Sequence, residues 1–123
     1  MSVAGYAWPL IGVAAVAGAL GRYLLDGAVE RRLHSRFPFG TCTVNLSGAA
    51  ALGLLHGAGA GGTLALVAGT AGLGTFTTFS TLIYETERLL EEGDRRLAAA
   101  NILGSMTLGL AAVAAGWWIG RGL

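Results

Sequence analysis

The chain has 123 residues, of which 54% are hydrophobic and only 12% are charged. A soluble domain of this length needs more polar surface, so the composition is typical of a membrane protein. The net charge is only +1 and no run of basic residues occurs, which argues against a nucleic-acid partner. The single cysteine, Cys42, cannot form an internal disulfide.

Four apolar stretches are long enough to span a lipid bilayer, which takes about 20 mostly apolar residues. They cover residues 3–25, 39–60, 62–84 and 97–120, and we expect them to form one domain over residues 1–123. The first stretch lacks the positive leading segment of a signal peptide, so we expect it to stay as a helix that Asp26 ends. Trp117 and Trp118, near the end of the fourth stretch, are typical interfacial anchors.

The connections between these stretches differ in character. Residues 26–36 and 85–96 are charged, and the third helix is expected to continue into water before Gly93. Residues 58–62 form a short glycine-rich turn. The pattern predicts an all-α membrane protein with four transmembrane helices. Small residues on several faces predict close helix contacts within or between chains, and hence an oligomer; they are Gly12, Gly18, Gly21, Gly48, Gly53, Gly104 and Gly109.

The third apolar stretch is a poor helix in its middle. Gly72 and Gly74 lie there among four threonines, and both residue types disfavour a helix interior. In lipid, such a break is tolerated only where it is buried in protein or lines a cavity. A break near the midplane would direct carbonyl oxygens of one half-helix at a cation and N–H groups of the other at an anion. The spacing alone leaves a packing face and an ion site equally open.

Polar side chains also lie inside the second and fourth stretches. Asn45 shares a face with Thr41 and, further along, with His56. Asn101 and Ser105 are four residues apart and share another face. An amide in lipid must find partners, so each stripe is either an interhelical hydrogen bond or part of a hydrated path. His56 lies near a helix end, where packing or an interfacial position is the simpler interpretation.

Two charged residues lie where the apolar stretches end. Arg22 is near the end of the first stretch and can extend to the interface, while Glu85 ends the third stretch at a vestibule or in the headgroups. The sequence has no Ser/His/Asp arrangement, no paired intramembrane carboxylates and no cluster of metal-binding side chains. We therefore do not expect an enzyme.

Three segments together resemble the Fluc, or CrcB, family of fluoride channels. They are GALGRY at residues 18–23, FPFGTCTVNLSG at 37–48 and GLGTFTTFSTLIYE at 72–85, in the order and at the spacing of that family. The resemblance covers essentially the whole chain. It implies a passive channel in the cell membrane, built as an antiparallel dimer of four-helix subunits, that lowers cytoplasmic fluoride.

The resemblance also implies roles for particular residues. A structural Na+ is expected at the centre of the broken third helix, held by backbone carbonyls of Gly74 and Thr77 from both subunits. Fluoride is strongly hydrated, so its path must replace water with donors and with the positive edge of an aromatic ring. The residues that fit this path are Asn45, Phe79, Ser80, Thr81 and Ser105, with Glu85 and Arg22 at the vestibule.

The chain departs from the family pattern at two positions. Leu82 stands where many members carry a second phenylalanine, and Asn101 stands where many carry a tyrosine four residues before a serine. A small multidrug-type exporter is one alternative, although it needs a membrane-embedded carboxylate that the first apolar stretch lacks. A non-conducting assembly subunit of a hetero-dimeric channel is the other alternative, because Leu82 cannot supply the ring of the second phenylalanine.

The arginines are distributed unequally between the two ends of the predicted helices. Arg121 is the one arginine on the side of both termini, whereas the other side carries Arg31, Arg32, Arg36, Arg88, Arg95 and Arg96, with Arg22 nearby. Short loops rich in arginine stay cytoplasmic, which predicts termini on the outside. An antiparallel homodimer needs both orientations. The chain is therefore expected to pair with a homologous subunit of opposite bias, or with itself if other signals override the arginines.

Overall fold

The computed structural model describes residues 5–123, and these residues form helices joined by short turns, with no strand. Three helical segments are long and apolar enough to cross a membrane, namely Ala7–Leu33, Gly62–Glu91 and Arg95–Arg121. The prediction of an all-helical, multi-pass membrane protein is confirmed at this level. The first predicted span begins at residue 3, which lies outside the described residues.

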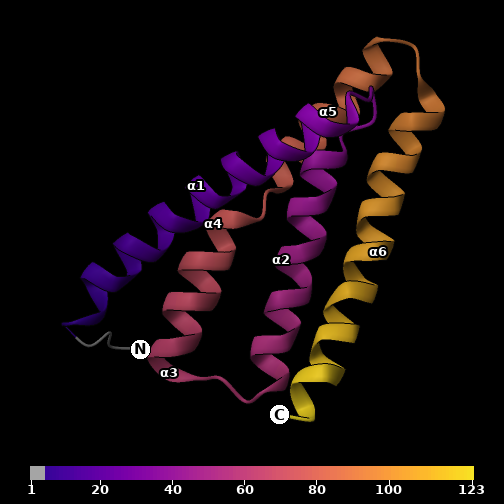
Figure 1. Cartoon of the computed structure of the whole chain (residues 1–123). Helices are drawn as coiled ribbons and strands as arrows, with labels where there is room; N and C mark the ends of the chain where they lie inside the picture. Colours follow the sequence, from indigo (N-terminus) through magenta and orange to yellow (C-terminus); the bar gives the residue numbers. More distant parts are fainter. Residues whose placement is uncertain (1–4) are drawn as a thin grey trace.

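Figure 1 shows how the elements are arranged in space. Helices α2 and α6 lie side by side, and α1 runs obliquely to them and contacts α2. The π-helix η1 and the short α4 pack against α1, whereas α5 packs against α6. The third helical segment, Gly62–Glu91, therefore packs against α1 in its first half and against α6 in its second half. The elements in chain order are α1 (Ala7–Leu33), α2 (Phe39–Gly57), α3 (Gly62–Leu64), η1 (Ala65–Leu73), α4 (Gly74–Phe76), α5 (Phe79–Glu91) and α6 (Arg95–Arg121).

The first helix is longer than its apolar part, so the prediction that Asp26 ends it is wrong. Helix α1 continues to Leu33 and ends at His34, which has a left-handed backbone with φ of 42°. The His34 N–H donates to the Glu30 carbonyl at 3.1 Å and closes the helix. An apolar run ends where lipid ends, but a helix ends only where its backbone hydrogen bonds are interrupted.

The other predicted boundaries agree with the structure more closely. Gly59 and Gly62 have φ of 84° and 56° in the turn between α2 and α3, as expected for a glycine-rich turn. Helix α5 continues past the apolar stretch to Glu91 and is followed by Gly93, with φ of 81°. The charged connection therefore extends the third helix beyond its apolar part, as the sequence predicted.

Glycines allow α2 and α6 to approach closely. A Cβ atom at Gly53 would collide with the Val113 carbonyl, and one at Gly116 would collide with the Ala50 carbonyl. Such backbone contact is typical of helix pairs in membranes. The close contacts predicted for Gly18, Gly48 and Gly53 are confirmed, while Gly12, Gly104 and Gly109 face open space within the described chain.

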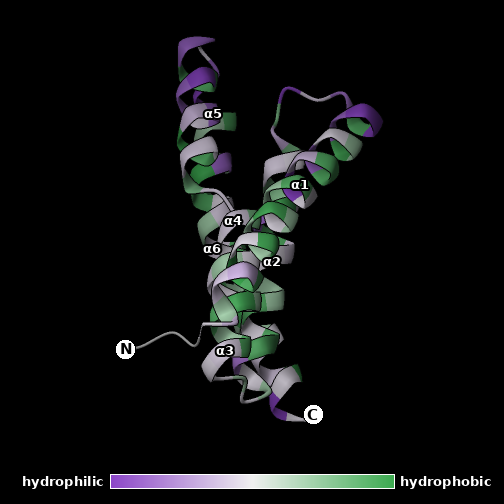
Figure 2. Cartoon of the chain, turned by 90° about the vertical axis from the view of Figure 1, so that its left-hand side faces the viewer, coloured by the Kyte–Doolittle hydropathy of each residue, from purple (hydrophilic) through white to green (hydrophobic). Residues whose placement is uncertain are grey.

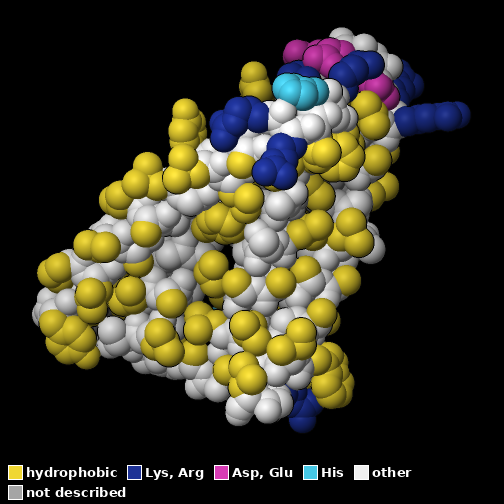
Figure 3. Space-filling view, viewed as in Figure 1, with side chains coloured by type: hydrophobic (Ala, Val, Ile, Leu, Met, Phe, Trp, Pro, Cys, Tyr) yellow, Lys and Arg dark blue, Asp and Glu magenta, His cyan; other side chains and the backbone are white. Residues whose placement is uncertain are grey.

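The two ends of the molecule differ in charge. Figure 2 shows an apolar middle with hydrophilic residues at the tips, and Figure 3 shows arginines and acids gathered at one end. At the opposite end the Arg121 guanidinium lies 4.6 Å from the Trp117 ring centre and 5.1 Å from that of Trp118. This cluster is consistent with the interfacial role expected for the two tryptophans.

Candidate functional site

The third helical segment is interrupted at two threonines. Thr77 has ψ of 157°, and Thr78 has φ of −148° and ψ of 121°, so both are extended. Gly72 and Gly74, which the sequence singled out, remain helical. The interruption therefore falls within the predicted stretch, at two of its four threonines and not at its glycines. Threonine is branched at Cβ and is more compatible with an extended backbone than with a helix.

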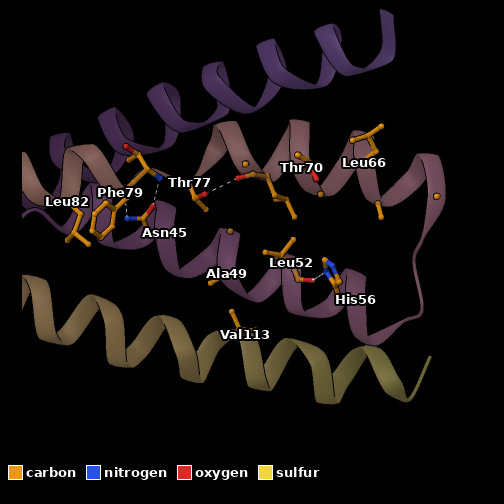
Figure 4. Close-up of a pocket in the computed structure, with 17 residues that line it drawn as sticks. Asn45, Ala49, Leu52, His56, Leu66, Thr70, Thr77, Phe79, Leu82 and Val113 are labelled. Carbon is orange, nitrogen blue, oxygen red and sulfur yellow. Dashed lines mark hydrogen bonds between the residues drawn. The ribbon is translucent and has the colours of Figure 1, made fainter. Parts of the chain in front are cut away.

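Asn45 bridges from α2 to the interruption. Its Nδ2 donates to the Thr78 carbonyl at 2.9 Å, and its Oδ1 accepts from the Thr78 N–H at 2.8 Å. The amide thus gives the Thr78 N–H an acceptor in place of the helical carbonyl and also donates to the Thr78 carbonyl. Figure 4 shows Asn45, with its hydrogen bonds dashed, beside Phe79. The interhelical hydrogen bond that the sequence allowed for Asn45 is present.

The helical hydrogen bonds stop at the interruption, and the carbonyls of Gly74 and Thr77 are among the four, at residues 74–77, that lose their helical donors. The Thr78 N–H is engaged with Asn45, so it does not close a turn onto the Gly74 carbonyl. The Thr77 carbonyl accepts no hydrogen bond from residues 5–123. The described residues contain no group of three His, Cys, Asp or Glu side chains able to hold a metal. The oxygens at this point are hard neutral donors, which suit an alkali cation.

Hydroxyl groups gather at the start of α5. The Thr78 Oγ1 accepts from the Thr81 N–H at 3.3 Å and caps the helix. The same oxygen lies 3.3 Å from Ser80 Oγ and 3.2 Å from Thr81 Oγ1. Three hydroxyls therefore surround a helix N-terminus, where N–H groups and the helix dipole favour negative charge.

A groove of about 770 Å³ opens beside the interruption, between α2 and the η1–α4 segment. Asn45, Gly74, Thr77 and Phe79 line it, and Figure 4 shows Asn45, Thr77 and Phe79 around its inner end. Phe79 is 66% exposed, so most of its surface is not covered by residues 5–123. The groove brings together the residues predicted for the cation and part of those predicted for the anion.

His56 lies at the other end of the groove from the interruption (Figure 4). Its Nδ1 is 3.0 Å from the Leu52 carbonyl, one turn earlier in the same helix. This position agrees with the interfacial interpretation of His56.

A second cavity of about 180 Å³ lies on the other side of the interruption. It is lined by Arg22 and Asp26 of α1, by Thr41 of α2 and by Thr78 and Thr81. Of the two predicted vestibule residues, Arg22 lines this cavity, whereas Glu85 is connected to it through Thr41, which donates to the Glu85 carboxylate at 2.6 Å. The sequence did not single out Asp26 as a lining residue, since it was assigned to a loop.

Asn101 connects α6 to α5. Its Nδ2 donates to Thr86 Oγ1 at 2.9 Å and to the Leu82 carbonyl at 3.4 Å, and the Thr86 hydroxyl donates to Leu82 at 2.7 Å. Both Asn101 and Ser105 are buried, and Asn101 Oδ1 and Ser105 Oγ have no partner among residues 5–123. Ser105 lines neither the groove nor the second cavity. Thr86 was missed, and its only signal was a polar residue one turn after Leu82.

These features define a class of protein. It is a helical membrane protein whose third segment is interrupted at Thr77 and Thr78, between a groove and a smaller cavity. Broken helices of this kind are the usual ion sites of membrane transport proteins.

Comparison with known proteins places the chain more narrowly. A sequence model of the family described as CrcB-like protein, Camphor Resistance (CrcB), matches residues 9–117, and the chain belongs to this family. A protein named "Fluoride-specific ion channel FluC 2" from Mycobacterium tuberculosis (strain ATCC 25618 / H37Rv) is 49% identical over 104 residues, covering 85% of this chain and 82% of the relative. "Fluoride-specific ion channel FluC 1" from Frankia casuarinae is 46% identical over 123 residues, covering 93% and 95% respectively. The resemblance read from the three sequence segments is confirmed.

Proposed function

We propose that this chain forms a fluoride-specific channel that lets fluoride leave the cytoplasm passively through the cell membrane. The observation that carries the proposal is the similarity to relatives named fluoride-specific ion channels, which extends over at least 82% of each relative cited above. The exporter and the non-conducting subunit are not favoured by these names. A passive channel also needs no catalytic group.

The anion path is proposed to follow the start of α5. Asn45 and Phe79 line the groove, and Thr81 lines the cavity on the other side of the interruption. Ser80 adds a hydroxyl next to the Thr78 cap. Together these groups offer N–H, O–H and ring-edge donors, which can replace the hydration shell of a small anion. The buried and unpartnered Ser105 hydroxyl is the remaining donor of the path.

A structural Na+ is proposed at the carbonyls of Gly74 and Thr77. The freed carbonyls supply neutral oxygen ligands, and two such oxygens from one chain are too few for an alkali cation. The same two from a second chain would double the set. A bound cation would hold the interruption together and raise the local potential for anions.

The functional unit is proposed to be an antiparallel dimer. The groove is open, the Phe79 ring is uncovered and the carbonyl set is incomplete within one chain. A second subunit of opposite orientation would cover all three features with one interface. Helix α2 is proposed as a further span of each subunit, which would make four, because 19 residues correspond to a length of roughly 28 Å, close to the apolar thickness of a bilayer.

The second subunit is proposed to be a homologous chain of opposite charge bias. Arginines gather at one end of the molecule, and Arg121 is at the other (Figure 3). Such a difference favours a single orientation in the membrane. A partner of opposite bias would insert the other way and could carry the aromatic ring that Leu82 lacks. A dual-topology homodimer is the competing arrangement.

Fluoride efflux from liposomes that contain the purified protein tests the channel function. Vesicles loaded with potassium fluoride should lose fluoride when potassium is allowed to leave through an ionophore, while vesicles loaded with chloride should not. Efflux that requires an opposing proton gradient would identify an exporter. If the chain alone gives no flux, and flux returns when a homologous subunit is added, the chain is an assembly subunit that conducts only as a pair.

A further inference from the structure

We propose that Asn45 is a positioning residue for the cation site, in addition to lining the anion path. Its amide takes the Thr78 N–H away from the Gly74 carbonyl and so leaves that carbonyl free to bind Na+. This inference rests on the proposed cation site and assigns the residue that creates it.

Two acceptors compete for the Thr78 N–H, namely the Gly74 carbonyl and Asn45 Oδ1. In an uninterrupted α-helix the N–H of residue 78 would donate to the carbonyl of residue 74. Here the Thr78 N–H donates instead to Asn45 Oδ1 at 2.8 Å. A carbonyl that has lost its helical donor in an apolar surrounding needs another partner, and a cation is a stronger one than an N–H group. Asn45 Oδ1 therefore determines whether the Gly74 carbonyl is free to bind a cation.

Thr78 also fixes the orientation of the Asn45 side-chain amide. Nδ2 donates to the Thr78 carbonyl at 2.9 Å, so both polar atoms of Asn45 are held by the same residue. This pairing fixes the amide plane and keeps Thr78 extended. One N–H of the amide stays free, because Nδ2 carries two hydrogens and only one is used by Thr78. The same geometry can thus support the cation site and leave a donor for the anion path.

Helix α2 also leaves space for the Thr77 side chain. A Cβ atom at Gly48 would collide with Thr77 Cγ2. Gly48 follows Asn45 by three residues and lies on the same side of α2, since both line the groove. One turn of α2 therefore does two things at the interruption. It withdraws the N–H donor from Gly74, and it makes room for Thr77 to turn out of the helix.

Two substitutions separate the positioning role from the conducting role. Asn45→Asp keeps an oxygen that accepts from Thr78 but loses the N–H donors and adds negative charge. It should lose fluoride flux and retain its response to Na+. Asn45→Leu has no acceptor, so Thr78 should return its N–H to Gly74, and both flux and the Na+ response should fall. Ser47→Ala is the matched control, because the Ser47 hydroxyl bonds only to carbonyls of its own helix.

The measurement is the thermal stability of the purified protein as NaCl replaces choline chloride at constant ionic strength. The wild type and Ser47→Ala should show the same Na+ midpoint, and Asn45→Asp should need no more Na+ than these, because it keeps the acceptor and its negative charge attracts a cation. Asn45→Leu should need about tenfold more Na+, the effect of losing about 1.4 kcal/mol of binding. An Asn45→Leu midpoint equal to the wild type overturns the inference. A wild type that does not respond to Na+ overturns the cation site itself, and the inference with it.

The salt dependence of folding tests the positioning role if Asn45→Leu is unstable. If Asn45→Leu does not yield folded protein in low Na+, purification in high NaCl should recover it, whereas the same concentration of KCl should not. Equal recovery in both salts, or in neither, overturns the positioning role. Asn45→Ala repeats the comparison with a residue that favours the helix.

Discussion

The Thr41 hydroxyl donates a 2.6 Å hydrogen bond to the Glu85 carboxylate, and so joins α2 to α5 on the charged side of the interruption. Arg88 approaches the other carboxylate oxygen at 3.9 Å, and the Glu85 side chain is only 16% exposed. A carboxylate that is mostly removed from water depends on such donors. Thr41 is therefore expected to stabilise the end of the proposed vestibule.

Thr41→Val should lower the free energy of unfolding by about 2 kcal/mol, because a hydrogen bond to a charged group is lost without any change in volume. Chemical unfolding in detergent measures the effect. Thr41→Ser keeps the hydroxyl and is the control, so it should unfold closer to the wild type. Equal stability of the valine and serine variants would show that Glu85 finds its donor elsewhere.

Phe79→Ile should reduce fluoride flux about tenfold or more, because the ring edge that faces the anion is replaced by an aliphatic group without a positive rim. Flux is measured in liposomes, and dimer formation is checked by cross-linking. Ile83→Leu is a control on the same helix, since Ile83 lies outside both cavities. Normal flux in Phe79→Ile would remove the ring from the path.

Gly116→Ala should destabilise the protein by roughly 1–3 kcal/mol, since the added methyl group meets the Ala50 backbone, which cannot move aside as a side chain would. Gly104→Ala adds the same atom on the same helix where nothing lies within 4 Å. It should be neutral or slightly stabilising through helix propensity. Thermal unfolding of both variants makes the comparison, and equal losses would contradict the close packing of α2 on α6.

The sequence predicted the helices well because their cause is local. Apolar length defines a span, and Gly59 and Gly93 mark the turns where backbones with positive φ are needed. The end of α1 was wrong for the opposite reason. Asp26 ends the apolar run, but nothing around it prevents a helix from continuing into water.

The site was harder to predict because its partners come from distant parts of the chain. The stretch expected to be a poor helix contained Gly72, Gly74 and four threonines, and the interruption falls at two of these threonines, Thr77 and Thr78, whose backbone is hydrogen-bonded by Asn45 from another helix. A helix propensity cannot locate a break that depends on such a partner. Likewise, the sequence marked Asn101 and Ser105 as polar but could not indicate Thr86 as the acceptor of the Asn101 amide.

The orientation of the chain in the membrane gives the last prediction. The ends of α1 and α2 that carry Ala7 and Gly57 lie with the C-terminal end of α6 on one side (Figure 1). Leu123→Cys, in a Cys42→Ala background, should react with a membrane-impermeant thiol reagent added to whole cells, because the arginine-rich end stays in the cytoplasm.

The arginines themselves provide the matched variant. Arg31, Arg32, Arg95 and Arg96 take part in no ion pair with the described residues, so their replacement by glutamine should leave the fold intact. It should also mix the two orientations and lower the labelling from outside toward one half. If the unmodified chain expressed alone already labels equally from both sides, the arginines do not fix its direction. The chain then pairs with itself as a dual-topology homodimer, and the hetero-pair is wrong.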